Sequence, residues 1–350
     1  MNKIRVLIID DSMLIRKILT EILNSSPDIE VVGAAADPLI ARDMIKQLNP
    51  DVLTLDIEMP KMDGITFLSN LMRLRPTPVV MISTLTEKGA AVTLEALTLG
   101  AVDFIAKPKV DVVSTLNNYA EEIISKVKMA ARANLSNSNR ALKSSVPDKT
   151  VADAYPTGKR PANDKLIIAL GASTGGTEAI KVVARGLPAD TPAIVITQHL
   201  PAAFSESFVK HIDLASKMTA LIPKHGQTVE NGHIYLAPGD RHMEIAKEGP
   251  RYVIKLLDTE PVNRHKPAVD VMFRSVAQCA GPNAIAVLLT GMGADGAVGM
   301  KEMHDAGAKT VIQDEQSSVV WGMPGSAYKL GCADFVLPLD DVAQKILSLV

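Results

Sequence analysis

Three residues far apart in the chain have side-chain types that together could activate a nucleophile. Ser173 lies in LGASTGG, which fits G-x-S-x-G, the pattern of a strand-to-helix turn that raises a serine hydroxyl above a sheet. His199 directly follows the apolar run AIVITQ, and Asp295 lies in GMGADGAVGM, after the run AIAVLLT. A histidine can take the serine proton, and a carboxylate can fix the tautomer of that histidine. These residue types predict acyl-transfer chemistry if the fold brings them together.

Taken alone, Ser173 is open to three interpretations. Serine is a favoured helix N-cap, so a purely structural role is one alternative. The turn also opens onto a helix N-terminus whose free N–H groups could hold a phosphate. Dinucleotide binding is disfavoured, because Ser173 replaces the central glycine of G-x-G-x-x-G and no acidic ribose partner follows at the usual distance. The nucleophile interpretation therefore depends on the partners of Ser173.

The partners are themselves ambiguous when each is considered alone. His199 could be a structural histidine, and Asp295 could be an ordinary turn residue. Asp295 lies among Gly291, Gly293 and Gly296, which permit positive φ and close approach of the backbone to a ligand. The N–H groups of Met292 and Thr174 are candidates for an oxyanion site. The other histidines lie in polar helical, loop or turn contexts and are predicted to be bystanders: His211, His225, His233, His242, His265 and His304.

A second group of reactive side chains follows successive strands near the N-terminus. Asp10 and Asp11 follow the run RVLII, and Asp56 follows DVLTL. Because the carboxyl ends of parallel strands share one edge, these carboxylates are expected to converge, and Mg²⁺ is the usual ion that relieves their repulsion. Ser83 and Lys107 end the fourth and fifth strands, so a hydroxyl and an ammonium are available to a phosphoryl group. The sequence therefore predicts a Mg²⁺ and phosphoryl site.

The elements that must position these residues alternate between strand and helix patterns. Short β-branched runs separated by helix-length segments extend over residues 4–128 and resume after residue 164. This alternation predicts an α/β protein with two doubly wound parallel-sheet domains, the first flavodoxin-like and the second Rossmann-like. The intervening stretch is polar and punctuated by Pro and Gly, as in a linker. The predicted domains are residues 1–128 and 164–350, joined by an interdomain linker over residues 129–163.

Composition limits the partners and the compartment. The chain has 350 residues, with 37 basic against 39 acidic side chains and a net charge of −2, so nucleic acid is not an expected partner. Cys279 and Cys332 show no metal-binding or disulfide spacing, which favours a reducing, cytoplasmic setting. No run is apolar over the length that a signal peptide or a membrane helix needs, so membrane insertion is not expected.

The runs DD, LDIEMPKMDG, MIS and AKP closely resemble the receiver domain of two-component response regulators, over residues 1 to about 125. This resemblance implies that a histidine kinase phosphorylates Asp56. It also implies that Asp10, Asp11 and Asp56 are Mg²⁺ ligands and that Ser83 and Lys107 sense the phosphate. Phe104 lies where the family has an aromatic switch residue, although an ordinary core role fits equally well. Lys107 precedes Pro108, and the sequence leaves the isomer of that peptide bond open.

The runs GASTGG, ITQHL and LTGMGADG resemble the CheB family of chemotaxis protein-glutamate methylesterases, over residues 165–350. The resemblance implies hydrolysis of glutamyl methyl esters on methyl-accepting chemoreceptors, giving sensory adaptation, and deamidation of receptor glutamines. It makes Ser173 the nucleophile, His199 the base and Asp295 the orienting carboxylate, with Thr174 and Met292 in support and no cofactor for the esterase reaction. It also implies that the receiver obstructs the active site until Asp56 is phosphorylated.

Two other functions fit parts of the sequence. A receiver commonly controls a DNA-binding domain, but residues 165–350 show strands and glycine-rich turns instead of a compact basic helix-turn-helix. A receptor-binding response regulator with a non-catalytic hydrolase-like domain is the other alternative. The presence of Ser173, His199 and Asp295 argues against it.

Overall fold

The computed structural model describes residues 3–84, 86–107, 116–133 and 165–350. The chain divides into two compact units, Met1–Leu142 and Lys143–Val350. Most of the predicted linker and the Lys107–Pro108 peptide bond lie outside the described residues. The domain boundaries at residues 128 and 163 therefore stay predictions.

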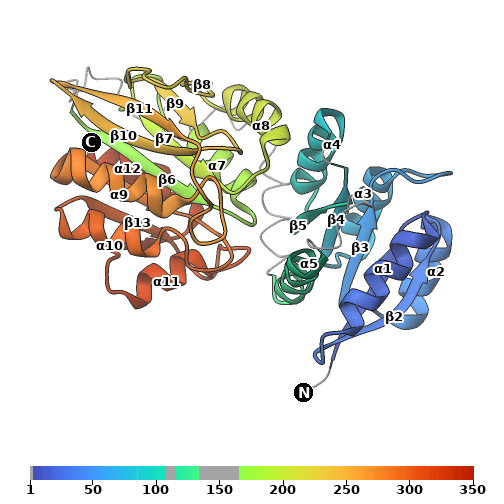
Figure 1. Cartoon of the computed structure of the whole chain (residues 1–350). Coiled ribbons are helices and arrows are strands. Elements are labelled where there is room, and N and C mark those ends of the chain that lie inside the picture. Colours follow the sequence, from blue (N-terminus) through green and yellow to red (C-terminus); the bar gives the residue numbers. More distant parts are fainter. Residues whose placement is uncertain (1–2, 85, 108–115, 134–164) are drawn as a thin grey trace. The chain divides into compact units, whose positions relative to one another are not determined.

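The first unit is built on a five-stranded sheet in the order β2–β1–β3–β4–β5, in which all neighbouring strands are parallel (Figure 1). This is the flavodoxin-like order. The strands are β1 (Ile4–Ile9), β2 (Ile29–Ala35), β3 (Val52–Asp56), β4 (Val79–Ser83) and β5 (Asp103–Ala106). The helices are α1 (Met13–Asn24), α2 (Pro38–Leu48), α3 (Gly64–Leu74), α4 (Glu87–Thr98) and α5 (Leu116–Ala130).

Helices α1 to α4 each begin at a residue whose side chain caps the helix, and helices α1 to α5 cover both faces of the sheet. The Ser12 hydroxyl accepts a hydrogen bond from the N–H of Ile15, and the Asp37 carboxylate accepts from two N–H groups at the start of α2. Helices α1 and α5 pack together on one face, while α2, α3 and α4 cover the other (Figure 1). The central strands β3 and β4 are buried along their whole length, as expected for strands covered on both faces.

The second unit contains a seven-stranded, entirely parallel sheet in the order β14–β13–β12–β6–β7–β9–β8. Its strands are β6 (Ile167–Ala172), β7 (Ile194–Gln198), β8 (Thr219–Leu221), β9 (His233–Leu236), β12 (Ala284–Leu288), β13 (Lys309–Gln313) and β14 (Phe335–Leu337). The two-domain α/β prediction is confirmed by these two parallel sheets. The chain leaves β6 toward β7 but leaves β12 toward β13, so the sheet has a topological switch point between β6 and β12, where ligands bind in such folds.

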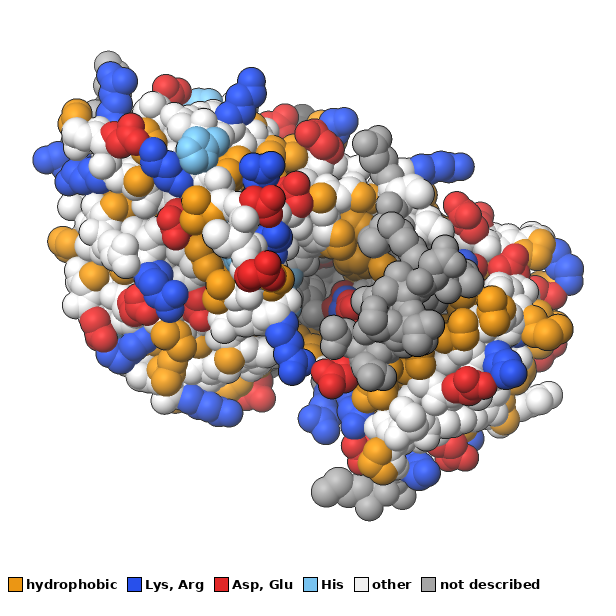
Figure 2. Space-filling model, viewed as in Figure 1, with side chains coloured by type: hydrophobic (Ala, Val, Ile, Leu, Met, Phe, Trp, Pro, Cys, Tyr) orange, Lys and Arg blue, Asp and Glu red, His pale blue; other side chains and the backbone are white. Residues whose placement is uncertain are grey.

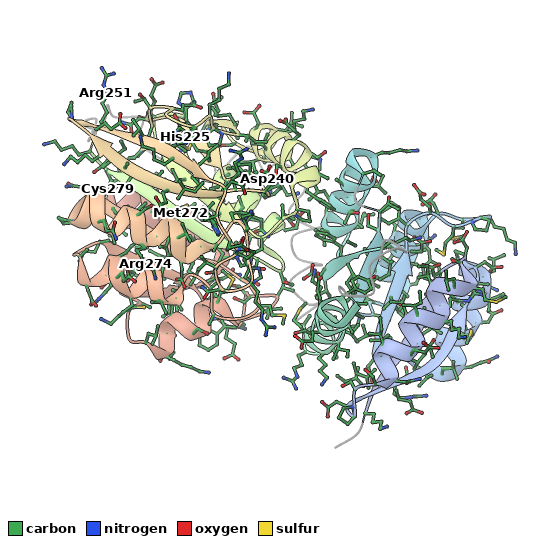
Figure 3. The ribbon with its side chains drawn as sticks, in the orientation of Figure 1. His225, Asp240, Arg251, Met272, Arg274 and Cys279 are labelled. Carbon is green, nitrogen blue, oxygen red and sulfur yellow. The ribbon has the colours of Figure 1, made fainter. Side chains whose placement is uncertain are left out.

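Helices cover both faces of the second sheet (Figure 1). They are α7 (Gly176–Arg185), α8 (Ala202–Ala215), α9 (Val269–Ala280), α10 (Ala297–Asp305), α11 (Met323–Lys329) and α12 (Leu339–Leu349), with a 3₁₀ turn, η2, at Gly281–Asn283. Helix α9 has one apolar face and one polar face. On the apolar face Met272 is fully buried, whereas Arg274 on the polar face pairs with Glu302 of α10 (both α9 residues are labelled in Figure 3).

The second unit also contains an antiparallel hairpin that the sequence did not indicate. Strands β10 (His242–Glu248) and β11 (Arg251–Leu257) form a separate two-stranded sheet. Strand β11 also exchanges backbone hydrogen bonds with residues 226–229, and β10 packs against α9. The apolar run YVIKLL, one of those after residue 164, lies in β11 of this hairpin and not in the parallel sheet, and no comparable run marks β8, β10 or β14. Strands β8 and β14 are three residues long, which is too short for a period-2 pattern to be recognised.

Charged side chains of both signs are interspersed on the face of the protein shown in Figure 2. Among the described residues, none of the helices is both long and apolar enough to cross a membrane.

Candidate active site and phosphoacceptor site

Ser173 lies on the turn between β6 and α7, and the backbone there depends on glycine. Gly175 has φ +76°, a conformation that L side chains rarely adopt, and a Cβ at Gly176 would lie 2.2 Å from the side-chain oxygen of Gln198. The Ser173 carbonyl accepts hydrogen bonds from the Gly176 N–H (2.7 Å) and from Nε2 of Gln198 (2.9 Å). The Ser173 N–H donates to the carbonyl of Thr290, in the loop directly after β12 (3.0 Å). The serine is therefore fixed at the switch point.

The structure brings the three predicted residues into one hydrogen-bonded row. His199, which follows β7, has its Nδ1 atom 3.1 Å from Ser173 Oγ and its Nε2 atom 2.8 Å from Asp295 Oδ2. A carboxylate can only accept, so Nε2–H donates to Asp295 and leaves Nδ1 free to accept the serine proton. Both His199 and Asp295 are largely buried. Low solvent access strengthens these charge-assisted bonds.

Asp295 is held by more partners than His199 alone. Its Oδ2 also accepts from the Val269 N–H (2.6 Å), and its Oδ1 accepts from Asn263 Nδ2 (2.7 Å) and the Asp270 N–H (3.2 Å). Burial alone would raise the pKa of this carboxyl. The hydrogen bonds from His199, Asn263 and Val269 outweigh burial and lower its pKa from 3.8 to about 2. Asp295 is therefore ionised over the whole physiological range.

Of the two residues predicted to support an oxyanion, Thr174 directly follows the serine, and Met292 directly follows a glycine that contacts it. The Thr174 carbonyl accepts from Thr290 Oγ1 (3.0 Å), which ties the start of α7 to the end of β12. Met292 follows Gly291, where a Cβ would lie only 2.9 Å from the Cβ of Ser173. The Gly291 carbonyl in turn accepts from the N–H groups of Gly322 and Met323, at the start of α11. The backbone of the glycine-rich loop is thus held in contact with the serine.

A second histidine contacts the row, contrary to the prediction that the remaining histidines are bystanders. The rings of His265 and His199 are stacked, with centroids 3.6 Å apart and planes 9° from parallel. His265 lies in the loop between β11 and α9, as does Asn263. This loop has no hydrophobic periodicity and lies 66 positions beyond His199, so local patterns could not find it. The pair of residues 263 and 264, both at positive φ, lacks the glycine that usually signals such a turn.

The carboxylates predicted for the first unit also lie together. Asp10, Asp11 and Asp56 each offer an oxygen atom, and these atoms lie within 4.8 Å of one another. Burial and the Asp56 charge raise the pKa of Asp10 to about 6, although Lys107 opposes the shift. Oδ2 of Asp10 is buried and accepts no hydrogen bond. An orphaned carboxylate oxygen beside two further carboxylates fits a hard divalent cation.

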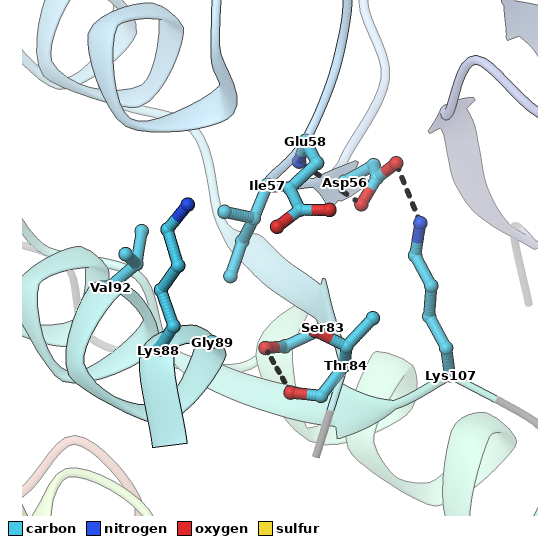
Figure 4. Close-up of a pocket in the computed structure, with 9 residues that line it drawn as sticks. All are labelled: Asp56, Ile57, Glu58, Ser83, Thr84, Lys88, Gly89, Val92 and Lys107. Atoms are coloured by element: carbon cyan, nitrogen blue, oxygen red, sulfur yellow. Dashed lines mark hydrogen bonds and ion pairs between the residues drawn. The ribbon is translucent and has the colours of Figure 1, made fainter. Parts of the chain in front are cut away.

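Lys107 closes the other side of this site (Figure 4). Its Nζ atom lies 2.7 Å from Oδ2 of Asp56 and 3.8 Å from Oδ2 of Asp10. Burial alone would lower the pKa of the Lys107 ammonium, but the bond to Asp56 and the nearby acidic charges raise it. For the Asp56 carboxyl, in contrast, burial raises the pKa, and the hydrogen bond and charge of Lys107 oppose that shift. The ammonium therefore stays charged beside the carboxylates.

Ser83 and Phe104 occupy defined positions near the carboxylates. Ser83 lines the same pocket as Asp56 and Lys107 (Figure 4). Its Oγ accepts a hydrogen bond from the hydroxyl of Thr93 on α4 (2.6 Å) and donates to the Thr84 carbonyl (3.2 Å). Phe104 is buried, with the ammonium of Lys126 located 5.0 Å from its ring centroid. The hydroxyl of Ser83 thus links the pocket to α4, and Phe104 fills the core in this structure.

The two units define a class: a receiver-type domain followed by a doubly wound α/β domain with a serine, histidine and aspartate in one hydrogen-bonded row. Two family models match the chain, the CheB methylesterase over residues 168–346 and the response regulator receiver domain over residues 6–117. The chain belongs to the CheB methylesterase family.

Named relatives and a solved structure agree with this assignment. A protein-glutamate methylesterase/protein-glutamine glutaminase 1 from Xanthomonas campestris pv. campestris is 58% identical over 347 residues, which cover 99% of this chain and 97% of the relative. One from Hydrogenovibrio crunogenus is 54% identical over the full length of both chains. The crystal structure of the Thermotoga maritima CheB methylesterase catalytic domain matches with a TM-score of 0.52 and 34% identity, covering 53% of this chain and 98% of that one.

Proposed function

We propose that this chain is a phosphorylation-regulated serine esterase that hydrolyses glutamyl methyl esters on methyl-accepting chemoreceptors, and that it also deamidates receptor glutamines. The observation that carries this proposal is the continuous row from Ser173 Oγ through the His199 ring to Asp295 Oδ2. The names of the relatives, which join methylesterase and glutaminase activities, support the substrate class. A non-catalytic receptor-binding domain would have no need for an aligned base and an ionised carboxylate.

In the proposed acylation step, Ser173 Oγ attacks the ester carbonyl carbon while His199 Nδ1 takes the serine proton. The ionised Asp295 stabilises the resulting imidazolium through the bond at Nε2. The backbone N–H groups of Thr174 and Met292 are the proposed donors to the oxyanion. When the tetrahedral intermediate collapses, the carbon–oxygen bond to the methoxy group breaks, and His199 returns the proton to the departing methanol.

Deacylation repeats the sequence with water as the nucleophile. His199 Nδ1 takes a proton from the water, the hydroxide attacks the acyl carbon, and the bond to Ser173 Oγ breaks as the proton returns to that oxygen. The product is a glutamate carboxylate. A glutamine side chain would follow the same path with ammonia leaving in place of methanol.

We infer that the first unit receives a phosphoryl group at Asp56 from a chemotaxis histidine kinase. A carboxylate oxygen of Asp56 would attack phosphorus and break the phosphorus–nitrogen bond of the phosphohistidine. Asp10, Asp11 and Asp56 would hold Mg²⁺, which when bound neutralises charge on the phosphoryl oxygens. Lys107 would pair with the phosphoryl group after phosphorylation, and the Ser83 hydroxyl would donate to it once its bond to the Thr84 carbonyl is released.

The test of the esterase proposal is methanol release from receptor methylated with labelled methyl groups. The full chain is expected to release methanol, and Ser173→Ala is expected to lose this activity. Ser348→Ala is the matched control, because Ser348 is exposed near the end of α12 and its hydroxyl bonds only to its own helix at Lys345. Equal release by the wild-type and Ser173→Ala chains would overturn the proposal.

A further inference from the structure

We propose that the loop from Glu260 to Ala268 holds the catalytic row in its reactive geometry, with Asn263 and His265 as positioning residues. This inference rests on the esterase activity proposed above and extends it to residues that touch the row without taking part in bond making. The loop joins the hairpin strand β11 to helix α9. It contacts two members of the row from different directions.

Asn263 fixes the rotation of the Asp295 carboxylate. Its Nδ2 atom donates to Oδ1 of Asp295 and to Oδ2 of Asp270, both at 2.7 Å, so both amide hydrogens are used. With Oδ1 occupied by Asn263 and by the Asp270 N–H, Oδ2 is left to face His199 and the Val269 N–H. The amide also separates two buried carboxylates that would otherwise repel each other. Loss of this side chain would free the carboxylate to turn.

His265 limits the movement of the His199 ring. The two rings are in van der Waals contact and nearly parallel, with centroids 3.6 Å apart. Rotation of the His199 ring out of its plane would move its edges into the stacked ring. The plane that it keeps is the one that contains the bonds to Ser173 Oγ and Asp295 Oδ2. His265 therefore acts through His199.

The loop is closed by a tight turn at its tip, and its two ends are joined by a buried histidine. Val262 and His265 exchange backbone hydrogen bonds (3.0 and 2.9 Å) around a tight turn, in which Asn263 has φ +54°. At the base, Nδ1 of the fully buried His242 accepts from the Ala268 N–H (3.1 Å), so its Nε2–H donates to the Glu260 carbonyl (3.0 Å). One neutral imidazole thus joins the two ends of the loop. Backbone and side chain together make the loop a rigid support.

The experiment measures two quantities in the full chain that do not depend on the natural substrate. The first is the rate at which a fluorophosphonate labels Ser173; serine Oγ bonds to phosphorus, fluoride leaves and His199 takes the proton. The second is the NMR signal of the proton that His199 Nε2 shares with Asp295. The variants are Asn263→Gly, which removes the amide but accepts the positive φ, His265→Ala, which removes the stack, and His265→Phe, which keeps an aromatic plane. His225→Ala is the control, because His225 is exposed and its ring bonds to the backbone of Leu256 in β11 and not to a residue of the loop or the row.

We expect Asn263→Gly and His265→Ala to slow labelling about tenfold and to shift the signal of the proton shared by His199 and Asp295. The loss is partial because these variants misalign the row but keep its three members, so His199 still activates Ser173 to some extent. His265→Phe and His225→Ala should label within about twofold of the wild-type chain. On methylated receptor, kcat should fall while KM is kept. The proposal is overturned if His265→Phe falls as far as His265→Ala, if Asn263→Gly labels at the wild-type rate, or if the wild-type chain is not labelled. Labelling without methanol release would refute the substrate but not the positioning roles.

Discussion

At the scale of single residues, the orientation of His199 determines the chemistry. Its Nδ1 faces the serine and its Nε2 faces the carboxylate, the reverse of the arrangement in chymotrypsin-type proteases. The two ring nitrogens can exchange roles because each step needs only one donor and one acceptor on opposite edges of the ring. The residue types were therefore predictable from the sequence, but the ring edge that each contacts depends on three loops arriving from different strands.

Asp295 should contribute to stability in a pH-dependent way. Its pKa in the folded chain is about 2, below its ordinary value of 3.8, so its contribution is complete above about pH 4 and is lost as the pH falls through about 2. Urea unfolding of the second unit, compared between wild type and Asp295→Asn, should show a stability difference at pH 5 that shrinks toward pH 2. A difference that grows on acidification would contradict the bonding described for this carboxylate.

The Asp10 carboxylate, unlike that of Asp295, should destabilise the unit that contains it when divalent cations are chelated. The carboxylate is fully buried and its Oδ2 has no hydrogen-bond partner. Asp10→Asn should therefore stabilise the metal-free first unit by about 1 kcal/mol at neutral pH, because a buried charge is removed. Added Mg²⁺ should raise the melting temperature of the wild-type chain more than that of the variant. Destabilisation by Asp10→Asn in the presence of chelator would mean that the carboxylate is better satisfied than its contacts indicate.

At the scale of elements, the sequence predicts the strands whose ends carry the site but not the loop that supports it. Asp10, Asp56 and Ser173 follow long β-branched runs, and the edge they share follows from the parallel sheet. Asn263 and His265 belong to an irregular loop, and their proximity to the row depends on the hairpin β10–β11 and on His242 at its base. A tertiary anchor of this kind leaves no periodic signal in the sequence.

The close approach of two loops should make Gly291 sensitive to substitution. A Cβ there would lie 2.2 Å from Met323 Sδ and 2.9 Å from the Cβ of Ser173, so Gly291→Ala should displace the serine turn and lower kcat by about a hundredfold. Gly249→Ala is the control, because Gly249 has a positive φ but open space around it at the β10–β11 turn. It should cost about 1 kcal/mol of stability and no activity. Retention of full activity by Gly291→Ala would show that the turn can move without harm.

At the scale of the whole molecule, a receiver in the same chain makes sense if it restrains the esterase. A phosphoryl group can shift this equilibrium only through a difference in its interactions with the restrained and released states. Removal of the receiver and linker, leaving residues 164–350, should raise basal esterase activity. A small-molecule phosphodonor with Mg²⁺ should activate the full chain but neither the fragment nor Asp56→Asn. A folded fragment with equal or lower basal activity would contradict inhibition by the receiver.

Ser173 and His199 are expected to act as one catalytic unit on a glutamyl methyl ester. The most direct test compares methanol release by Ser173→Ala, His199→Ala and the double variant against methylated receptor. If the two residues form one unit, the double variant should lose no more activity than either single variant, because each removes the same machinery. Losses that multiply in the double variant would show that the two side chains act independently and would contradict the account.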